Sequence, residues 1–164
     1  MNINSKFKLE KCPNIYSGVF DQNNKIICLP VTSESSVHFY KLGEKSPISI
    51  VKLNNCKPDL AHCINENEFL IGCQDSSPPI IISKQKILKY IKTYSDNFFA
   101  TSIKQSKDGK IFIGNLNGKP IIFDGNTSYE INLPIDSSYD CIWISEEYLI
   151  VGCYRDNKIK LIKI

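Results

Sequence analysis

Few residue types in this chain could carry chemistry, and their spacing argues against catalysis. The two histidines, His38 and His62, have no nucleophile or ligand motif nearby, as a catalytic triad or a metal site would require. Glycine patterns that cradle phosphates or dinucleotides are absent, and the eight glycines fall at turns. We therefore expect a chain that is not an enzyme, with no catalytic residues, no metal and no cofactor.

The seven cysteines are odd in number and form no C-x-x-C pair; they are Cys12, Cys28, Cys56, Cys63, Cys73, Cys141 and Cys153. Metal ligands or redox thiols are one interpretation, but metal-ligand spacing is missing. We favour small apolar side chains that fill tight interior sites. Residues 1–11 lack the apolar core of a signal peptide and no run is long enough to span a membrane, so we expect a cytoplasmic or nuclear protein.

The basic residues do not form a nucleic-acid-binding block. The net charge is +3, and Arg155 is the single arginine, while the lysines are spread along strand-like segments. Phosphate and base recognition relies on the guanidinium fork, so nucleic acid is not an expected partner. The lysines are typical of outward faces and protected sheet edges.

The elements that position these residues form a repeat. A hydrophobic run ends in Gly, passes a polar turn and restarts, in the segments 69–82, 111–123 and 149–162. A weaker copy at 26–40 has Pro30 at the Gly position, and the spacings between these positions are 42, 42 and 38 residues. Alternating, Ile-rich runs favour strands over helices. A period near 40 with several strands per unit predicts stacked β-repeats, because one unit cannot bury its apolar face alone.

Each unit divides into four strands joined by turns such as Ser106–Lys110. The units cover about residues 15–53, 59–92, 96–133 and 140–164, and the last is one strand short. The alternating segment 6–10 lacks a partner of its own. Pairing it with the last unit would join the two ends and remove exposed sheet edges. We expect one domain over residues 1–164.

These residues resemble a degenerate WD-repeat β-propeller. The segment from Gly152 to Lys163 follows that family's Gly-containing turn and alternating strand, with Ile162 and Lys163 where Trp and Asp usually stand. Phe123-Asp124 and Tyr40-Lys41 are the corresponding terminal pairs. The resemblance implies an all-β propeller of four blades, each of four antiparallel strands, with the N-terminal strand closing the last blade. Since four blades are few, the alternatives are half of a larger propeller formed by dimerisation, or a fragment completed by a partner.

The resemblance also implies which residues share a loop face. Asp59, Asp96 and Asp140 are each expected just ahead of an inner strand, and with Asp75 and Asp156 they would form an acidic rim. One interpretation is a docking surface for a basic peptide; the other is that each carboxylate accepts hydrogen bonds in its own turn. Tyr154 and Arg155 are further contact candidates because these residue types are enriched at binding hot spots.

The function that follows is a non-catalytic scaffold or adaptor that presents loops on a rigid propeller to other proteins. A structural subunit that completes a larger complex is one alternative, and an enzyme with its site at the axial mouth is another. Trp143 is interpreted as part of the core.

Overall fold

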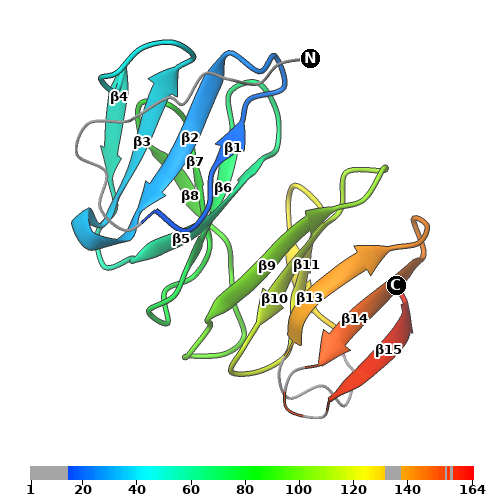
Figure 1. Cartoon of the computed structure of the whole chain (residues 1–164). Coiled ribbons are helices and arrows are strands. Elements are labelled where there is room, and N and C mark those ends of the chain that lie inside the picture. Colours follow the sequence, from blue (N-terminus) through cyan, green and yellow to red (C-terminus); the bar gives the residue numbers. More distant parts are fainter. Residues whose placement is uncertain (1–14, 132–137, 154, 156) are drawn as a thin grey trace.

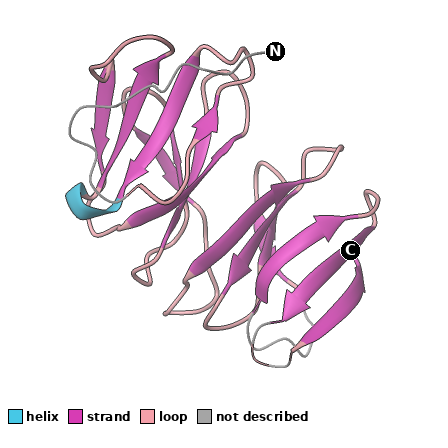
Figure 2. Cartoon of the chain, in the orientation of Figure 1, coloured by secondary structure: helices cyan, strands magenta, loops and turns pink. Residues whose placement is uncertain are grey.

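The computed structural model describes residues 15–131, 138–153, 155 and 157–164, and almost every regular element in it is a strand (Figure 2). Sheet 1 contains β1 (Val19–Phe20), β2 (Ile26–Val31), β3 (Ser36–Lys41) and β4 (Ser49–Lys52) in that order, with a short 3-10 helix, η1 (Thr32–Glu34), between β2 and β3. Within this described part, no helix has the length and apolar composition that crossing a membrane requires.

The other sheets repeat the same antiparallel order. Sheet 2 holds β5 (Pro58–Cys63), β6 (Phe69–Cys73), β7 (Ile80–Ile82) and β8 (Ile87–Tyr90). Sheet 3 holds β9 (Ala100–Gln105), β10 (Ile111–Asn115), β11 (Ile121–Phe123) and β12 (Ser128–Glu130). Sheet 4 has three strands, β13 (Ser138–Trp143), β14 (Tyr148–Cys153) and β15 (Lys158–Lys163). The closing strand expected at residues 6–10 lies outside the described residues.

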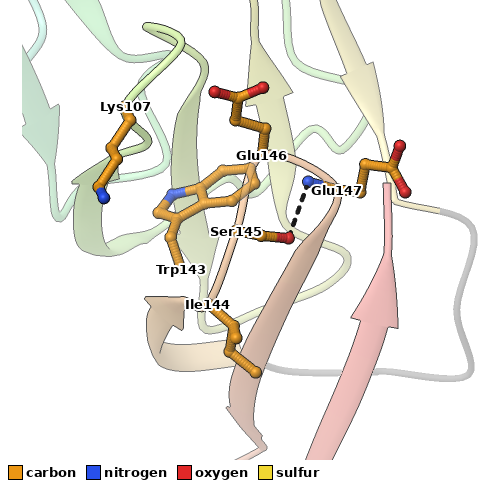
Figure 3. A pocket seen from close by; sticks show the side chains of 6 residues that line it. All are labelled: Lys107, Trp143, Ile144, Ser145, Glu146 and Glu147. Carbon is orange, nitrogen blue, oxygen red and sulfur yellow. Dashed lines mark hydrogen bonds between the residues drawn. The ribbon is translucent and has the colours of Figure 1, made fainter.

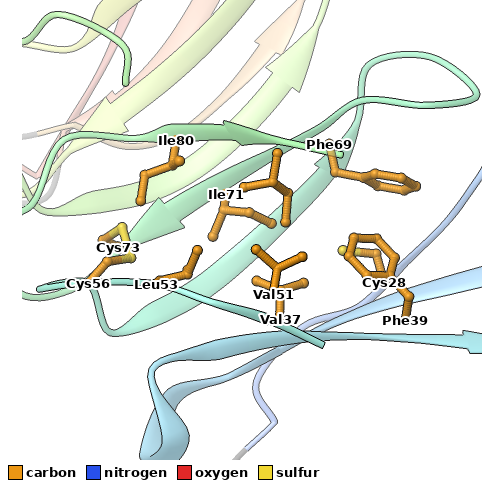
Figure 4. Packing of buried hydrophobic residues seen from close by; sticks show 11 residues of the cluster. Cys28, Val37, Phe39, Val51, Leu53, Cys56, Phe69, Ile71, Cys73 and Ile80 are labelled. Carbon is orange, nitrogen blue, oxygen red and sulfur yellow. A yellow bond between two sulfur atoms is a disulfide. The ribbon is translucent and has the colours of Figure 1, made fainter. Parts of the chain in front are cut away.

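Consecutive sheets pack face to face, and each has a front face toward the next sheet and a back face toward the previous one. At the first joint, Cys28 and Phe39 of sheet 1 pack on Phe69 and Ile71 of sheet 2 (Figure 4). The Phe39 and Phe69 rings meet edge to face, 5.2 Å between centroids. Strand alternation places successive side chains on opposite faces, so one strand contributes to two joints.

The second and third joints repeat this packing. Leu70 and Ile81 form the front of sheet 2 against the back of sheet 3, and Phe112 and Ile122 form the front of sheet 3 against the back of sheet 4. All four side chains are buried. Burial of such a side chain stabilises the fold by about 1.5–3 kcal/mol, so each joint ties its two sheets together.

Side-chain hydrogen bonds to the backbone reinforce the joints. Ser17 Oγ donates to the Asp59 carbonyl at 2.6 Å, and Thr101 Oγ1 donates to the Ser138 carbonyl at 2.8 Å. The sheets follow one another along the molecule, with sheet 1 at one end and sheet 4 at the other (Figure 1).

A disulfide joins Cys56, in the connection between sheets 1 and 2, to Cys73 at the end of β6. The interpretation of every cysteine as an apolar filler is therefore wrong for these two, since the fold brings their Cα atoms to 5.6 Å, within bonding range. It holds for the buried thiols of Cys28, Cys141 and Cys153. Burial raises the pKa of the Cys141 thiol to about 12, and the nearby Asp140 adds to the shift. Cys141 is therefore a protonated, unreactive core side chain at neutral pH.

Candidate functional site: the Trp143 groove

A groove of about 440 Å³ lies where the turns of sheets 3 and 4 meet. We call it the Trp143 groove, and it is lined by Lys107, Trp143, Ile144, Ser145, Glu146 and Glu147. Figure 3 shows the indole of Trp143 between Lys107 and the turn that carries Ser145, Glu146 and Glu147. The groove combines an aromatic floor with charged walls, as sites for peptide side chains commonly do.

The strand β13 fixes the floor. Trp143 is its last residue and packs partly against the core shared by sheets 3 and 4. Its Nε1 donates to the Lys104 carbonyl at 3.1 Å, which holds the ring across the joint between these sheets. The polar atom is thereby satisfied inside the protein, and the remaining ring surface is left for an apolar contact.

A tight turn fixes the acidic wall. The amide of Ser145 donates to the Tyr148 carbonyl at 3.2 Å, and the amide of Glu147 donates to Ser145 Oγ at 3.3 Å. Glu147 also pairs with Lys163, 3.9 Å between Oε2 and Nζ, but both side chains are well exposed. Water screens such a pair, so Glu147 can exchange Lys163 for a ligand cation at little cost.

The opposite wall belongs to the β9–β10 turn of sheet 3. Lys110 Nζ pairs with Asp108 Oδ2 at 2.8 Å and donates to the Glu146 carbonyl at 3.3 Å. The hydrogen bond from Lys110, helped by Ser106, lowers the pKa of the Asp108 carboxyl. Because Asp108 and Lys110 neutralise each other, Lys107 and the two glutamates set the charge of the groove.

A second, smaller cavity of about 210 Å³ lies along the inner strands, between Leu60 of β5, residues 101–104 of β9 and Asp140. Asp140 Oδ1 lies 3.7 Å from Lys104 Nζ and also accepts the Cys141 amide at 2.8 Å. This predicted site residue therefore faces a cation within the chain, and water screens the pair because both side chains are about half exposed.

The other predicted aspartates lie in different surroundings. Asp59 is half-buried within β5, and burial raises the pKa of its carboxyl. Asp75 accepts the Lys57 amide at 2.7 Å, and its carboxylate lies within 4.8 Å of the sulfurs of Cys56 and Cys73. Asp96 is exposed ahead of β9, and Arg155 is exposed between β14 and β15. Tyr154 and Asp156 lie outside the described residues.

The Trp143 groove and the predicted loop face lie at opposite ends of the inner strands. Asp59 and Asp140 are near the starts of β5 and β13, whereas Trp143 ends β13 and Lys107 follows β9. The acidic rim remains a prediction. The interpretation of Trp143 as a core residue does not predict the groove. The signal in the sequence is a tryptophan closely followed by two acidic residues, in Trp143-Ile144-Ser145-Glu146-Glu147.

The two histidines do not join either cavity. His38 Nε2 lies 3.0 Å from Ser36 Oγ and 3.2 Å from Glu34 Oε2, and His62 Nε2 lies 3.1 Å from Gln105 Oε1. Burial lowers the pKa of both imidazoles, although Glu34 partly opposes the shift at His38. Both are expected to be neutral hydrogen-bonding groups at pH 7.

Solved structures share this arrangement of sheets. The computationally designed Ika4 protein superposes with a TM-score of 0.78 over 99% of both chains, at 12% identity. The WD40 domain of Doa1 superposes with a TM-score of 0.73 at 14% identity, over 91% of this chain and 50% of that one. The fold is a β-propeller.

A propeller from Bacteroides fragilis that carries the provisional name 6-phosphogluconolactonase also superposes, with a TM-score of 0.75 and 14% identity, over 92% of this chain and 51% of that one. The chain thus spans about half the length of the WD40 domain and of this protein. No protein-family model and no curated protein sequence matches the chain. The propeller fold is shared by WD40 domains and proteins named as enzymes, so the site must carry any functional argument.

Proposed function

We propose that this propeller is a non-catalytic interaction module that binds an extended peptide segment in the Trp143 groove. The observation that carries the proposal is a partly exposed indole, already satisfied at Nε1, on the floor of a groove walled by Glu146 and Glu147. The peptide would place an apolar side chain on the indole and a Lys or Arg beside the glutamates. Because packed strands and a hydrogen-bonded turn fix these groups, little ordering entropy opposes binding.

The experiment uses the chain's own fluorophore. Trp143 is the single tryptophan, so its emission reports directly on the groove. Peptides selected from a random display library on the folded protein are titrated against wild type, with the expectation that the emission shifts on saturation. The Glu146→Lys/Glu147→Lys variant is expected to bind more than about tenfold more weakly, since two attractive charges become repulsive.

A matched control lies in the same turn of sheet 2. Glu66 follows β5 as Glu146 follows β13, and its Oε1 accepts a hydrogen bond from Asn23 Nδ2 at 3.1 Å. Glu66→Lys is expected to leave the affinity unchanged. Selected peptides that bind both variants as well as wild type, or that leave the emission unchanged, would contradict the proposal.

An enzyme with an axial site is the competing function, favoured by the structural match to the lactonase-named protein and by the Lys104–Asp140 pair in the axial cavity. It predicts hydrolysis of sugar lactones by wild type and its loss in Asp140→Asn. We infer the interaction module instead because Asp140 is the single carboxylate among the described residues that line the axial cavity, and Cys141, the neighbouring thiol, is held protonated.

A further inference from the structure

The three joints of the propeller bury the same register position each time. The pairs Cys28–Phe39 in sheet 1, Leu70–Ile81 in sheet 2 and Phe112–Ile122 in sheet 3 are cross-strand partners between the second and third strands. Each pair belongs to the front face, and each side chain is at most 3% exposed because the next sheet covers it.

The equivalent pair in sheet 4 is Ile150–Leu161. Leu161 is 64% exposed, although its counterparts Ile81 and Ile122 are buried. Ile142, which pairs with Ile150, is 68% exposed, and Ile159, on the same side of β15, is 77% exposed. The front face of sheet 4, which we define as Ile142, Ile144, Ile150, Ile159 and Leu161, is therefore an uncovered copy of an apolar face that seats a neighbouring sheet three times in this molecule.

The back face of sheet 1 is not its complement. There Leu29 pairs with His38, and His38 pairs with Ile50. Leu29 and His38 are already buried, and Ser36 and Tyr40, which share this side of β3, are buried as well. A second chain arriving head to tail would find this face largely covered and partly polar, where the other back faces offer Ile80 and Ile82 or Ile121 and Phe123.

We propose that the front face of sheet 4 binds the same face of a second copy of this chain, related by two-fold symmetry. A two-fold axis makes one patch serve both partners, which is the commonest arrangement in homo-oligomers. The rim carries both signs of charge, Glu147 and Lys163, so two copies can meet without net like-charge repulsion. The alternating faces of two sheets can then interdigitate as in a sandwich.

The area of the apolar front face of sheet 4 sets the affinity that we expect for the dimer. A standard stable interface buries about 800 Å² per partner, and three short strands with five apolar side chains offer less than that. We therefore expect a dimer with a dissociation constant in the micromolar range, dominated by the exposed side chains of Leu161 and Ile142, which flank Ile150 in one cross-strand row.

The test is sedimentation equilibrium from about 5 to about 200 µM, combined with urea unfolding to show that each variant is folded. Wild type should show a monomer–dimer equilibrium, and Leu161→Glu should remain monomeric because two buried like charges would face each other across the axis. Ile50→Glu is the matched control: Ile50 is 47% exposed on an outer strand of sheet 1, away from the proposed interface. It should dimerise like wild type.

Three results would overturn the proposal. A wild-type chain that is monomeric throughout the range has no such interface. Loss of the dimer in both Leu161→Glu and Ile50→Glu would instead assign a head-to-tail ring of two chains. A dimer that survives Leu161→Glu in a folded protein would place the contact elsewhere.

Discussion

The two outermost faces of the propeller are both built from antiparallel strands and have opposite environments. On the back face of sheet 1, the row Leu29–His38–Ile50 is mostly buried and carries an imidazole. On the front face of sheet 4, the row Ile142–Ile150–Leu161 is apolar and mostly exposed. A β-strand alternates in the same way at both ends, so the difference arises from what covers each face rather than from the strand itself.

This difference has an energetic consequence. An apolar side chain contributes to stability only in proportion to the area it removes from water. A large apolar or aromatic side chain should therefore contribute several kcal/mol to the free energy of unfolding on the buried back face of sheet 1, and close to nothing on the exposed front face of sheet 4.

The largest effect is expected for Tyr40→Ala on the back face of sheet 1. Tyr40 is 1% exposed, and truncation of a buried aromatic ring leaves a cavity that costs about 3–5 kcal/mol of unfolding free energy. Urea denaturation followed by circular dichroism measures this loss. A cost below about 1 kcal/mol would show that this face is not a covered core and would remove the contrast with sheet 4.

The disulfide should have the next largest effect, because it ties the connection after sheet 1 to sheet 2. Its cysteines are 17 residues apart, and loss of a cross-link of that span costs about 3 kcal/mol through the unfolded chain. We expect reductant, or Cys56→Ser with Cys73→Ser, to lower the free energy of unfolding by about that amount. Cys63→Ser, a half-buried thiol outside the disulfide, is the control and should still respond to reductant.

Acid should lower the free energy of unfolding through His38 and His62. Burial lowers the pKa of His38 and of His62 from the ordinary 6.5, so the unfolded chain takes up these protons first. Their contribution to stability is complete above pH 6.5 and declines as the pH falls below it. Unfolding free energies measured between about pH 7.5 and pH 5 should show this decline, and His38→Gln/His62→Gln should flatten it. An unchanged slope in that variant would assign the decline to other groups.

The smallest effect is expected for Leu161→Ser on the front face of sheet 4. At concentrations low enough to keep the chain monomeric, the unfolding free energy should change by less than about 0.5 kcal/mol, as for other exposed positions. A loss comparable to that of Tyr40→Ala would mean that the face is covered within a single chain.

The sequence predicts the propeller because repeat spacing and strand alternation are local patterns. The Gly positions near 72, 114 and 152 and the turn at Ser106–Lys110 were sufficient for four sheets of antiparallel strands. Which faces are covered could not be predicted, since Ile81 and Leu161 occupy equivalent positions in similar strands and differ only in their neighbours.

The candidate site was harder to predict for the same reason. The Trp143 groove depends on two turns about 40 residues apart meeting across a joint, and the Cys56–Cys73 pairing depends on how the connection after sheet 1 returns to β6. The aspartates were chosen by their place in the repeat, and the structure gives Asp140 a partner in Lys104 that spacing alone does not reveal.

Side-chain footprinting with hydroxyl radicals, read out by mass spectrometry at about 1 µM and about 200 µM, tests the open face most directly. We predict that Ile142, Ile159 and Leu161 become protected at the higher concentration while Ile50 is modified equally at both. Modification of Leu161 that does not change with concentration, or protection of Ile50 to the same degree, would contradict it.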